Sequence, residues 1–341
     1  MNVPRVLITT DYLRPGDEVD AYLVAAGLTT HHAPTAGRHG PDELVAALAG
    51  VEAALIGHDP LTADVLGRAP RLRVVVRTGV GYDSVDVGAA ARLGISVSNL
   101  PGINAGAVAE YTMGLLLASA RRLVESAVGV AAGGWPRGDG RELRGATLGL
   151  VGHGAAARAV VPLARAFGMD VVCTTGVPAG LRDDASVRFV PFAELLAVSD
   201  YVSVHTALTD RTRGMFDASA FARMKPTAVL VNTARGAVVD ERALADAVRN
   251  GVIAGRRSMW WCRNRSRRTV RCGVSRGSPS TPISRVRPRR PAGPPGWPAP
   301  PNSWPRSRAG PASPSPDGQP RTATAEGPPT WSAAPRTCPV L

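Results

Sequence analysis

Three small residues with regular spacing mark the stretch of the sequence whose chemistry is easiest to recognise. Gly152 and Gly154 are separated by one residue, and Ala157 follows three positions later. They stand between a short apolar run, residues 147–151, and a segment in which apolar residues recur with helical spacing. Glycine adopts backbone angles that other residues resist, and it lets a ligand approach the main chain closely. The pattern therefore predicts a strand, a tight glycine turn and a helix.

A phosphate group is the ligand that suits such a turn, because the first free N–H groups of the helix and its dipole favour negative charge. In dinucleotide-binding proteins the second glycine makes room for the pyrophosphate, and the small third residue lets helix and strand pack closely. Ala155 and Ala156 would supply the first N–H groups here. A glycine triplet also occurs in plain structural turns, but the flanking strand and helix favour the dinucleotide.

The next strand, predicted at residues 170–173, leads to the position that distinguishes coenzymes. An acidic residue about 20 positions beyond the glycine turn normally holds the adenosine ribose. Thr175 occupies this position. A threonine can hydrogen-bond a ribose but cannot reject a 2′-phosphate by its charge, so NAD and NADP both remain possible. Cys173 lies inside the apolar strand, and we interpret it as a packing residue rather than a reactive thiol.

Charge divides the 341-residue chain into two unlike parts. Residues 256–341 contain 16 arginines against two acids, which accounts for the whole net charge of +13, and they hold 18 of the 30 prolines. Without this tail the chain is almost neutral. The length suits two domains, and the apolar share of 44% is that of a globular protein. The cysteines show neither metal-ligand spacing nor a disulfide framework, so no metal is expected.

A cytoplasmic protein is expected, because no charged leader with an apolar run opens the chain and no stretch is long enough to cross a bilayer. Strands and helices alternate along the sequence, which is typical of an α/β fold with parallel sheets. Strands are predicted at residues 6–9, 53–56, 72–76, 95–98, 147–151, 170–173, 201–205 and 228–232. Helices are predicted at residues 18–26, 41–48, 64–66, 84–93 and 104–123, and after the glycine turn.

Two loops at the carboxyl ends of predicted strands could contact a ligand, because open parallel sheets bind ligands at that edge. Residues 77–83 contain two glycines, and their N–H groups would suit a carboxylate. An ordinary strand-to-helix turn is the alternative interpretation. Arg235 follows the strand that ends at Asn232. A solvated arginine at a helix entry is the alternative there.

Taken together, the motifs resemble the D-2-hydroxyacid dehydrogenase family, close to its phosphoglycerate dehydrogenase branch. The resemblance runs from about residue 5 to Gly255. It is carried by residues 79–86, 108–110, 152–154, 202–206, 224–226 and 229–236.

The resemblance implies two doubly wound parallel-sheet domains. Residues 1–100 would form a flavodoxin-like substrate domain and residues 101–255 a Rossmann cofactor domain, with the site in the cleft. The family transfers a hydride between C2 of a D-2-hydroxy acid and the nicotinamide of NAD, with NADP not excluded here. A small 2-hydroxy or 2-oxo acid substrate and a homodimer are also implied, whereas a membrane or nucleic-acid partner is not.

Individual roles follow only from the resemblance. Arg235 would fix the substrate's carboxylate and carbonyl, for which the bidentate geometry of a guanidinium is suited. Val80, Gly81 and Asn104 would also bind the substrate. His205 and Thr206 would border the cofactor rather than move protons. The residues assigned to the cofactor are Gly152, Gly154, Ala155, Ala156, Thr175, His205, Thr206, Thr233, Ala234 and Arg235.

Four positions depart from the family pattern. The family usually has arginine and isoleucine at positions 155 and 156, an acid at position 175 and proline at position 207, where this chain has Ala155, Ala156, Thr175 and Ala207. Each difference weakens the expected cofactor binding without excluding it.

The resemblance stops at Gly255. There the family continues with a strand ending in aspartate, a glutamate-proline pair with the catalytic glutamate, and later a proline-histidine pair with the catalytic base. This chain has Arg256 and an arginine-rich segment instead. Met259-Trp260-Trp261 can only be encoded by ATG-TGG-TGG. Read from the third base of each codon with GC-rich codons, residues 257–265 become leucine-aspartate-valine-valine-valine-proline-glutamate-proline.

The same register over residues 282–286 yields histidine-isoleucine-alanine-glycine, the family's catalytic histidine segment. We therefore hypothesise that the chain is out of frame from about Arg256, through a lesion or an error in the recorded sequence. The nucleotide sequence of the gene decides this, because the other frame must encode both family segments. A tail of this composition, residues 288–335 above all, is expected to be disordered.

Loss of the family's C-terminal part has two expected consequences. The cofactor sheet would lose its last strands and keep an unpaired edge. Turnover would be negligible, since acid–base assistance is worth roughly 10²- to 10⁴-fold in rate. A catalytically idle NAD(H)-binding protein is one alternative function. A nucleic-acid-binding protein that uses the basic tail is another, less favoured one.

Overall fold

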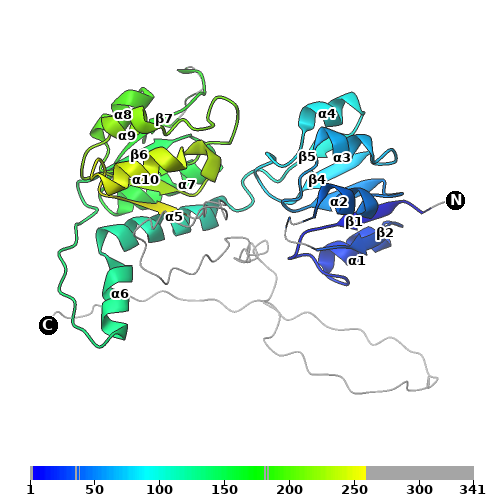
Figure 1. Ribbon diagram of the computed structural model, residues 1–341, viewed down its shortest axis with the longest axis horizontal. Coiled ribbons are helices and arrows are strands. Elements are labelled where there is room, and N and C mark those ends of the chain that lie inside the picture. The colour runs from blue at the N-terminus through cyan, green and yellow to red at the C-terminus, as the bar shows by residue number, and fades with distance from the viewer. Residues whose placement is uncertain (1–2, 35–36, 38, 180–181, 183, 259–341) are drawn as a thin grey trace, which may run out of the picture. The chain divides into compact units, whose positions relative to one another are not determined.

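The structure is a computed structural model that describes residues 3–34, 37, 39–179, 182 and 184–258. These residues form two parallel β-sheets, each accompanied by helices (Figure 1). The predicted α/β class with two doubly wound parallel sheets is therefore confirmed. Within the described part of the chain, no helix combines the length and the apolar character needed to span a membrane. Apart from residues 256–258, the expected disordered tail and its alternative role in binding nucleic acid fall on residues outside the described ranges.

The first sheet has the strand order β2-β1-β3-β4-β5, the doubly wound order of flavodoxin-like folds. Its helices begin at side chains that accept backbone hydrogen bonds from the first turn, as Asp17, Thr62 and Asp86 do. The strands are β1 (Arg5–Ile8), β2 (Thr29–His32), β3 (Ala53–Ile56), β4 (Val74–Arg77) and β5 (Ser96–Ser98), and the helices are α1 (Glu18–Ala25), α2 (Pro41–Ala47), α3 (Ala63–Gly67) and α4 (Val87–Arg92).

The second sheet has the order β11-β10-β9-β6-β7-β8, which is the Rossmann order. Two helices, α5 (Ala105–Ala120) and α6 (Leu123–Ala131), precede it. The strands are β6 (Thr147–Val151), β7 (Asp170–Thr174), β8 (Arg188–Phe189), β9 (Tyr201–Val204), β10 (Val229–Asn232) and β11 (Gly255–Ser258). The helices are α7 (Ala155–Ala166), α8 (Phe192–Val198), α9 (Ala218–Arg223) and α10 (Glu241–Arg249), with a short 3₁₀ helix over Gly236–Val238.

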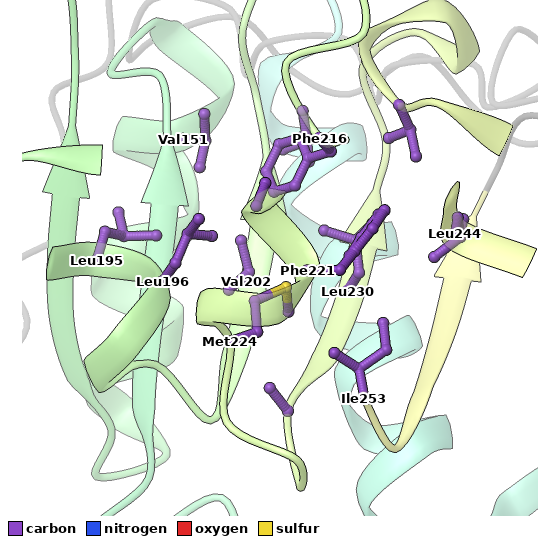
Figure 2. Close-up of a cluster of buried hydrophobic side chains, with 14 of the residues drawn as sticks. Val151, Leu195, Leu196, Val202, Phe216, Phe221, Met224, Leu230, Leu244 and Ile253 are labelled. Carbon is purple, nitrogen blue, oxygen red and sulfur yellow. The ribbon is translucent and has the colours of Figure 1, made fainter. Parts of the chain in front are cut away.

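A cluster of apolar side chains fixes helices α8, α9 and α10 to the second sheet (Figure 2). Phe216 is fully buried at its centre, and its ring meets that of Phe192 edge to face with 5.4 Å between centroids. Phe221 and Leu244 come from α9 and α10, and Leu230 comes from β10. Because such cores are close-packed, the carboxyl ends of β6, β9 and β10 are held in fixed positions relative to one another.

Sequence reasoning missed strands β2 and β8 and helices α6 and α8. Strand β2 contains only threonine and histidine, so it lacks the apolar alternation by which strands are recognised, and its pairing with β1 decides its conformation. Strand β8 has only two residues. The helix predicted over residues 104–123 ends as α5 at Ala120, and the separate helix α6 starts at Leu123, because Arg122 between them is left-handed with φ +51°. A left-handed residue cannot continue a right-handed helix.

The expectation that the second sheet loses all its strands beyond Gly255 is wrong for the first of them. Strand β11 pairs in parallel with β10, and Gly255 aligns with Val229. Strand pairing uses main-chain N–H and C=O groups, so a changed sequence can still complete the ladder. Any later strands would fall outside the described residues. The predicted domain limits at residues 100 and 255 stay predictions.

Candidate functional site

The glycine turn lies where the strand order of the second sheet reverses. Strand β6 pairs with β7 on one side and with β9 on the other. Connections leave such a point in opposite directions, which opens the crevice where α/β sheets bind ligands. Gly152 donates its N–H to Thr174 O at 2.8 Å, and His205 donates its N–H to Val151 O at 2.8 Å. The turn is thus fastened to the ends of both neighbouring strands.

The two glycines of the turn serve different purposes. Gly152 has φ +105°, and a Cβ there would lie 2.7 Å from His205 O and 2.9 Å from Thr206 N. Both conformation and space exclude a side chain at that position. Gly154 has φ −80°, and a Cβ there would meet nothing within 4 Å. The second glycine therefore keeps the surface of the turn open, as close approach of a ligand requires.

Helix α7 begins directly beside this open surface. Gly154 is its N-cap residue, and no side chain caps the helix. The first N–H groups of a helix have no partner within it, and the helix dipole makes this end positive. Ala155 and Ala156 have side chains too small to cover these groups. The turn and the helix start therefore fit the pyrophosphate of a dinucleotide.

The end of strand β7 borders the same turn. Thr175 is half-buried, and its hydroxyl accepts a hydrogen bond from Val177 N at 3.2 Å. Cys173 is fully buried, and burial raises the pKa of its thiol to about 12. The interpretation of Cys173 as a packing residue is confirmed. His153, between the two glycines, has its Nε2 3.1 Å from Asp184 Oδ2.

His205 follows strand β9 on the other side of the turn. Its Nε2 lies 2.9 Å from Ser203 Oγ, within hydrogen-bonding distance. Burial lowers the pKa of His205 to about 4. The ring is therefore neutral near pH 7, which suits a residue that borders a ligand better than one that must exchange protons in each turnover.

A second set of predicted residues lies at the loop after strand β4. A Cβ on Gly81 would overlap the guanidinium of Arg235, and a Cβ on Gly79 would overlap that of Arg77. Neither glycine has a positive φ, so their function is to leave space for two arginines. Arg235 Nε donates to Asp83 Oδ1 at 2.7 Å. Gly81 and Arg235, predicted to share a site, are thus in direct contact.

The main chain around Arg235 is held by one amide side chain. Asn232 Nδ2 donates to Arg235 O at 2.9 Å, and Asn232 Oδ1 accepts from Ala234 N at 3.0 Å. Thr233 is buried, and its hydroxyl lies 3.4 Å from that of Thr112 on α5. These contacts give the segment after β10 a fixed shape, so the arginine is presented from a rigid base.

Val80 and Asn104 are less closely engaged. Val80 is 41% exposed, and its carbonyl accepts from Asn99 Nδ2 at 2.6 Å. Asn104 is the N-cap residue of α5 but makes no side-chain capping bond. A Cβ on Gly102, two residues earlier, would lie 3.4 Å from the Cβ of Ala155. The segment that carries Asn104 therefore runs close to the start of α7.

Sequence reasoning placed Arg77 and Asp83 in the ligand-binding loop 77–83 but gave their side chains no role, and it missed His58. Arg77 is only 5% exposed, its Nε has no hydrogen-bond partner in the described structure, and burial together with the charge of Arg235 lowers its pKa. Partial desolvation and the charges of Arg77 and Arg235 lower the pKa of His58, although this residue is exposed at the surface. Arg77 and His58 stand at the carboxyl ends of β4 and β3, and that position was the signal that could have identified them. Among the described residues, no cluster of histidine, cysteine and acidic side chains is arranged to hold a metal ion.

Substitution of the first glycine should destabilise the protein much more than substitution of the second. Gly152→Ala forces a Cβ onto His205 O and a positive φ onto alanine, so the free energy of unfolding should fall by about 2–4 kcal/mol. Gly154→Ala meets no atom and should change it by less than about 1 kcal/mol. Urea unfolding followed by circular dichroism measures both. Equal losses would contradict the different roles of the two glycines.

The lowered pKa of His205 should make stability depend on pH. In the unfolded chain this ring binds a proton below about pH 6.5. In the folded chain it stays neutral down to about pH 4. The free energy of unfolding should therefore fall by roughly 3 kcal/mol as the pH drops from 6.5 to 4. His205→Gln should remove this part of the dependence, whereas the exposed His31→Gln should retain it. An unchanged pH profile in His205→Gln would contradict the assignment.

Comparisons with known proteins agree with this geometry. The family model described as D-isomer specific 2-hydroxyacid dehydrogenase, NAD binding domain, matches residues 113–257. The glyoxylate reductase of Aeropyrum pernix is 42% identical over 206 residues, which cover 58% of this chain and 62% of that protein. The hydroxypyruvate reductase of Thermotoga maritima is 37% identical over 215 residues, or 62% of this chain and 70% of that protein.

Among solved structures, the TT0316 protein from Thermus thermophilus is 37% identical with a TM-score of 0.65, over 74% of this chain and 81% of that one. The chain thus spans less than two thirds of the Aeropyrum pernix enzyme, although it spans more of the other two proteins. The predicted resemblance is confirmed. The chain belongs to the D-isomer-specific 2-hydroxyacid dehydrogenase family, and it carries that family's NAD-binding domain.

Proposed function

We propose that this chain binds a nicotinamide dinucleotide and a small D-2-hydroxy acid or the corresponding 2-oxo acid, and that it is catalytically idle as written. The observation that carries the proposal is the position of Arg235, whose guanidinium lies directly against the main chain of Gly81. This contact joins the arginine at the end of β10 to the glycine loop at the end of β4. Both loops lie at ligand-binding edges of their sheets.

The bound coenzyme would supply or accept the hydride at C2 of the acid. Arg235 would hold the carboxylate and the neighbouring oxygen, because a guanidinium can donate two parallel hydrogen bonds. The N–H groups of Val80 and Gly81 would take the remaining carboxylate oxygen. Arg77, with a buried Nε that has no partner in the described structure, adds a second positive charge. These groups favour a small anionic substrate.

Proton transfer is the step that this chain would lack. The hydroxyl proton has to move as the hydride does, and a positioned acid–base group usually provides this. His205 is unsuited because it stays neutral and its Nε2 faces Ser203. The family's glutamate and histidine segments do not occur in the sequence after Gly255. The proposed idle state follows from this missing chemistry rather than from loss of binding.

The test separates binding from turnover. Isothermal titration calorimetry of the full chain should detect binding of NADH or NADPH. Reduction of glyoxylate and hydroxypyruvate, followed at 340 nm, should be at least about 10²-fold slower than in a chain whose reading frame is restored from Arg256 onward. When Arg235→Ala is introduced into the restored chain, its kcat/KM should be about 10²-fold lower than that of the restored chain without the substitution.

Each half of the proposal can fail separately. Absence of binding by either coenzyme would refute the assigned function. Turnover by the chain as written at the rate of the restored chain would refute only the idle state.

We also propose that the chain forms a homodimer through α6 and the loop that follows it. Helix α6 has no buried residue, Leu123 is 50% and Val130 58% exposed, and Trp135 is 79% exposed. Apolar groups exposed together in this way are typical of a surface that a partner covers.

Analytical ultracentrifugation should give twice the chain mass of 35.4 kDa. Trp135→Asp should shift the chain toward monomer, because it places a charge in the covered surface. Tyr22→Asp on α1, where the ring is 75% exposed, should leave the mass unchanged. A monomeric unmodified chain would contradict the proposal.

A further inference from the structure

We propose that the loop after strand β7 selects a coenzyme with a 2′-phosphate over one with a free 2′-hydroxyl. This inference rests on the proposed dinucleotide binding and deepens it by naming the residues that choose between the two forms. The residues are Thr175, Arg182 and Arg158, which come from the end of β7, the loop after it and the first half of α7.

The residue directly after β7 is uncharged in this chain. A carboxylate at this place accepts hydrogen bonds from the ribose hydroxyls and repels a 2′-phosphate, whereas an arginine nearby accommodates one. Thr175 carries no charge. Its hydroxyl accepts from Val177 N at 3.2 Å, which turns the chain at this point. A 2′-phosphate would meet no carboxylate from residue 175.

Asp184 is an acid in the loop that follows β7. The Asp184 side chain is 20% exposed, and its Oδ2 is 3.1 Å from His153 Nε2. Its Oδ1 accepts from Ser186 N at 3.0 Å and from the hydroxyl of Ser186. Both carboxylate oxygens are therefore engaged within the protein, and Asp184 serves to tie this loop to the glycine turn. It is not an unengaged acceptor for ribose hydroxyls.

Arg182 lies in the same loop and is held in place by its contacts. Its Nε donates to Val177 O at 2.9 Å, so Arg182 and Thr175 bind the carbonyl and the amide of the same residue. The guanidinium carbon lies 5.5 Å from the centre of the Phe189 ring. An aromatic face holds a guanidinium by a cation–π contact. Of the five N–H donors of an arginine, this arrangement uses one.

Arg158 brings a second guanidinium to the turn. Its Nη1 donates to His153 O at 3.0 Å, which places its charge on the residue between the two glycines. The His153 ring meets Phe189 edge to face, with 5.1 Å between centroids. Arg158, His153, Phe189 and Arg182 are thus linked in one continuous chain of contacts. Arg182 bonds the same residue as the uncharged Thr175, and Arg158 bonds the glycine turn. Two guanidiniums on these connected segments suit a dianionic phosphate, which arginine binds well.

The test uses fragments that lack the nicotinamide, so it does not depend on catalysis. Isothermal titration calorimetry of the full chain should show 2′,5′-ADP binding about tenfold or more tightly than 5′-AMP, as expected for charge-assisted hydrogen bonds. NADP⁺ should bind more tightly than NAD⁺ by a similar factor. A preference that weakens as salt concentration rises would agree with its electrostatic origin.

Variants assign the preference to individual side chains. In Arg182→Ala the affinities for 2′,5′-ADP and 5′-AMP should differ by less than about threefold. Arg182→Lys should keep part of the preference because the positive charge remains. Thr175→Asp should reverse it by repelling the phosphate. Arg188→Ala is the matched control, since Arg188 precedes Phe189 but pairs with Glu194 at 2.8 Å. It should leave the ratio unchanged.

The outcomes separate this inference from the proposed function. Equal or tighter binding of 5′-AMP and NAD⁺ would overturn the inference and leave the function intact. Binding of neither fragment and neither dinucleotide would overturn both. A preference for 2′,5′-ADP that survives in Arg182→Ala and Thr175→Asp would overturn the assignment of these residues.

Discussion

The close approach of Gly152 to the main chain of His205 and Thr206 is the contact on which the second sheet's ligand-binding edge depends. A single Cβ at Gly152 would come within 3 Å of the neighbouring loop. The absence of that atom lets the loops after β6 and β9 leave the sheet side by side before they diverge. Everything proposed for the coenzyme, from the open surface at Gly154 to the N–H groups of α7, lies next to this contact.

Glycines also provide space at the ligand-binding edge of the first sheet, but for side chains rather than for the main chain. Gly79 and Gly81 have ordinary backbone angles, and what they provide is room for the side chains of Arg77 and Arg235. Glycine in the motif of one sheet thus permits a backbone conformation, while glycine in the other makes space for positive charge. In both places the ligand-facing groups come from loops and the rigidity comes from the strands beneath them, as is usual for α/β sites.

Much of this could be predicted from sequence, because parallel strands and their helices follow apolar patterns that are visible locally. The α/β class and the glycine turn were found in that way. Strand β2 could not be found, since it has no apolar residue and depends on its neighbour. Arg77 and Asp83 were passed over for a related reason. Their importance comes from Arg235, more than 150 residues away in sequence, and no local pattern reports a contact at that range.

Strand β11 shows that the pairing of an edge strand depends little on its side chains. Four residues pair with β10 in regular register, although the resemblance predicted from the sequence ends at the first of them, Gly255. A gene that shifts its frame at this point would therefore move the edge of the described sheet from β10 to β11. A change of sequence at this point therefore alters the side chains along the edge of the sheet while the backbone ladder continues for one more strand.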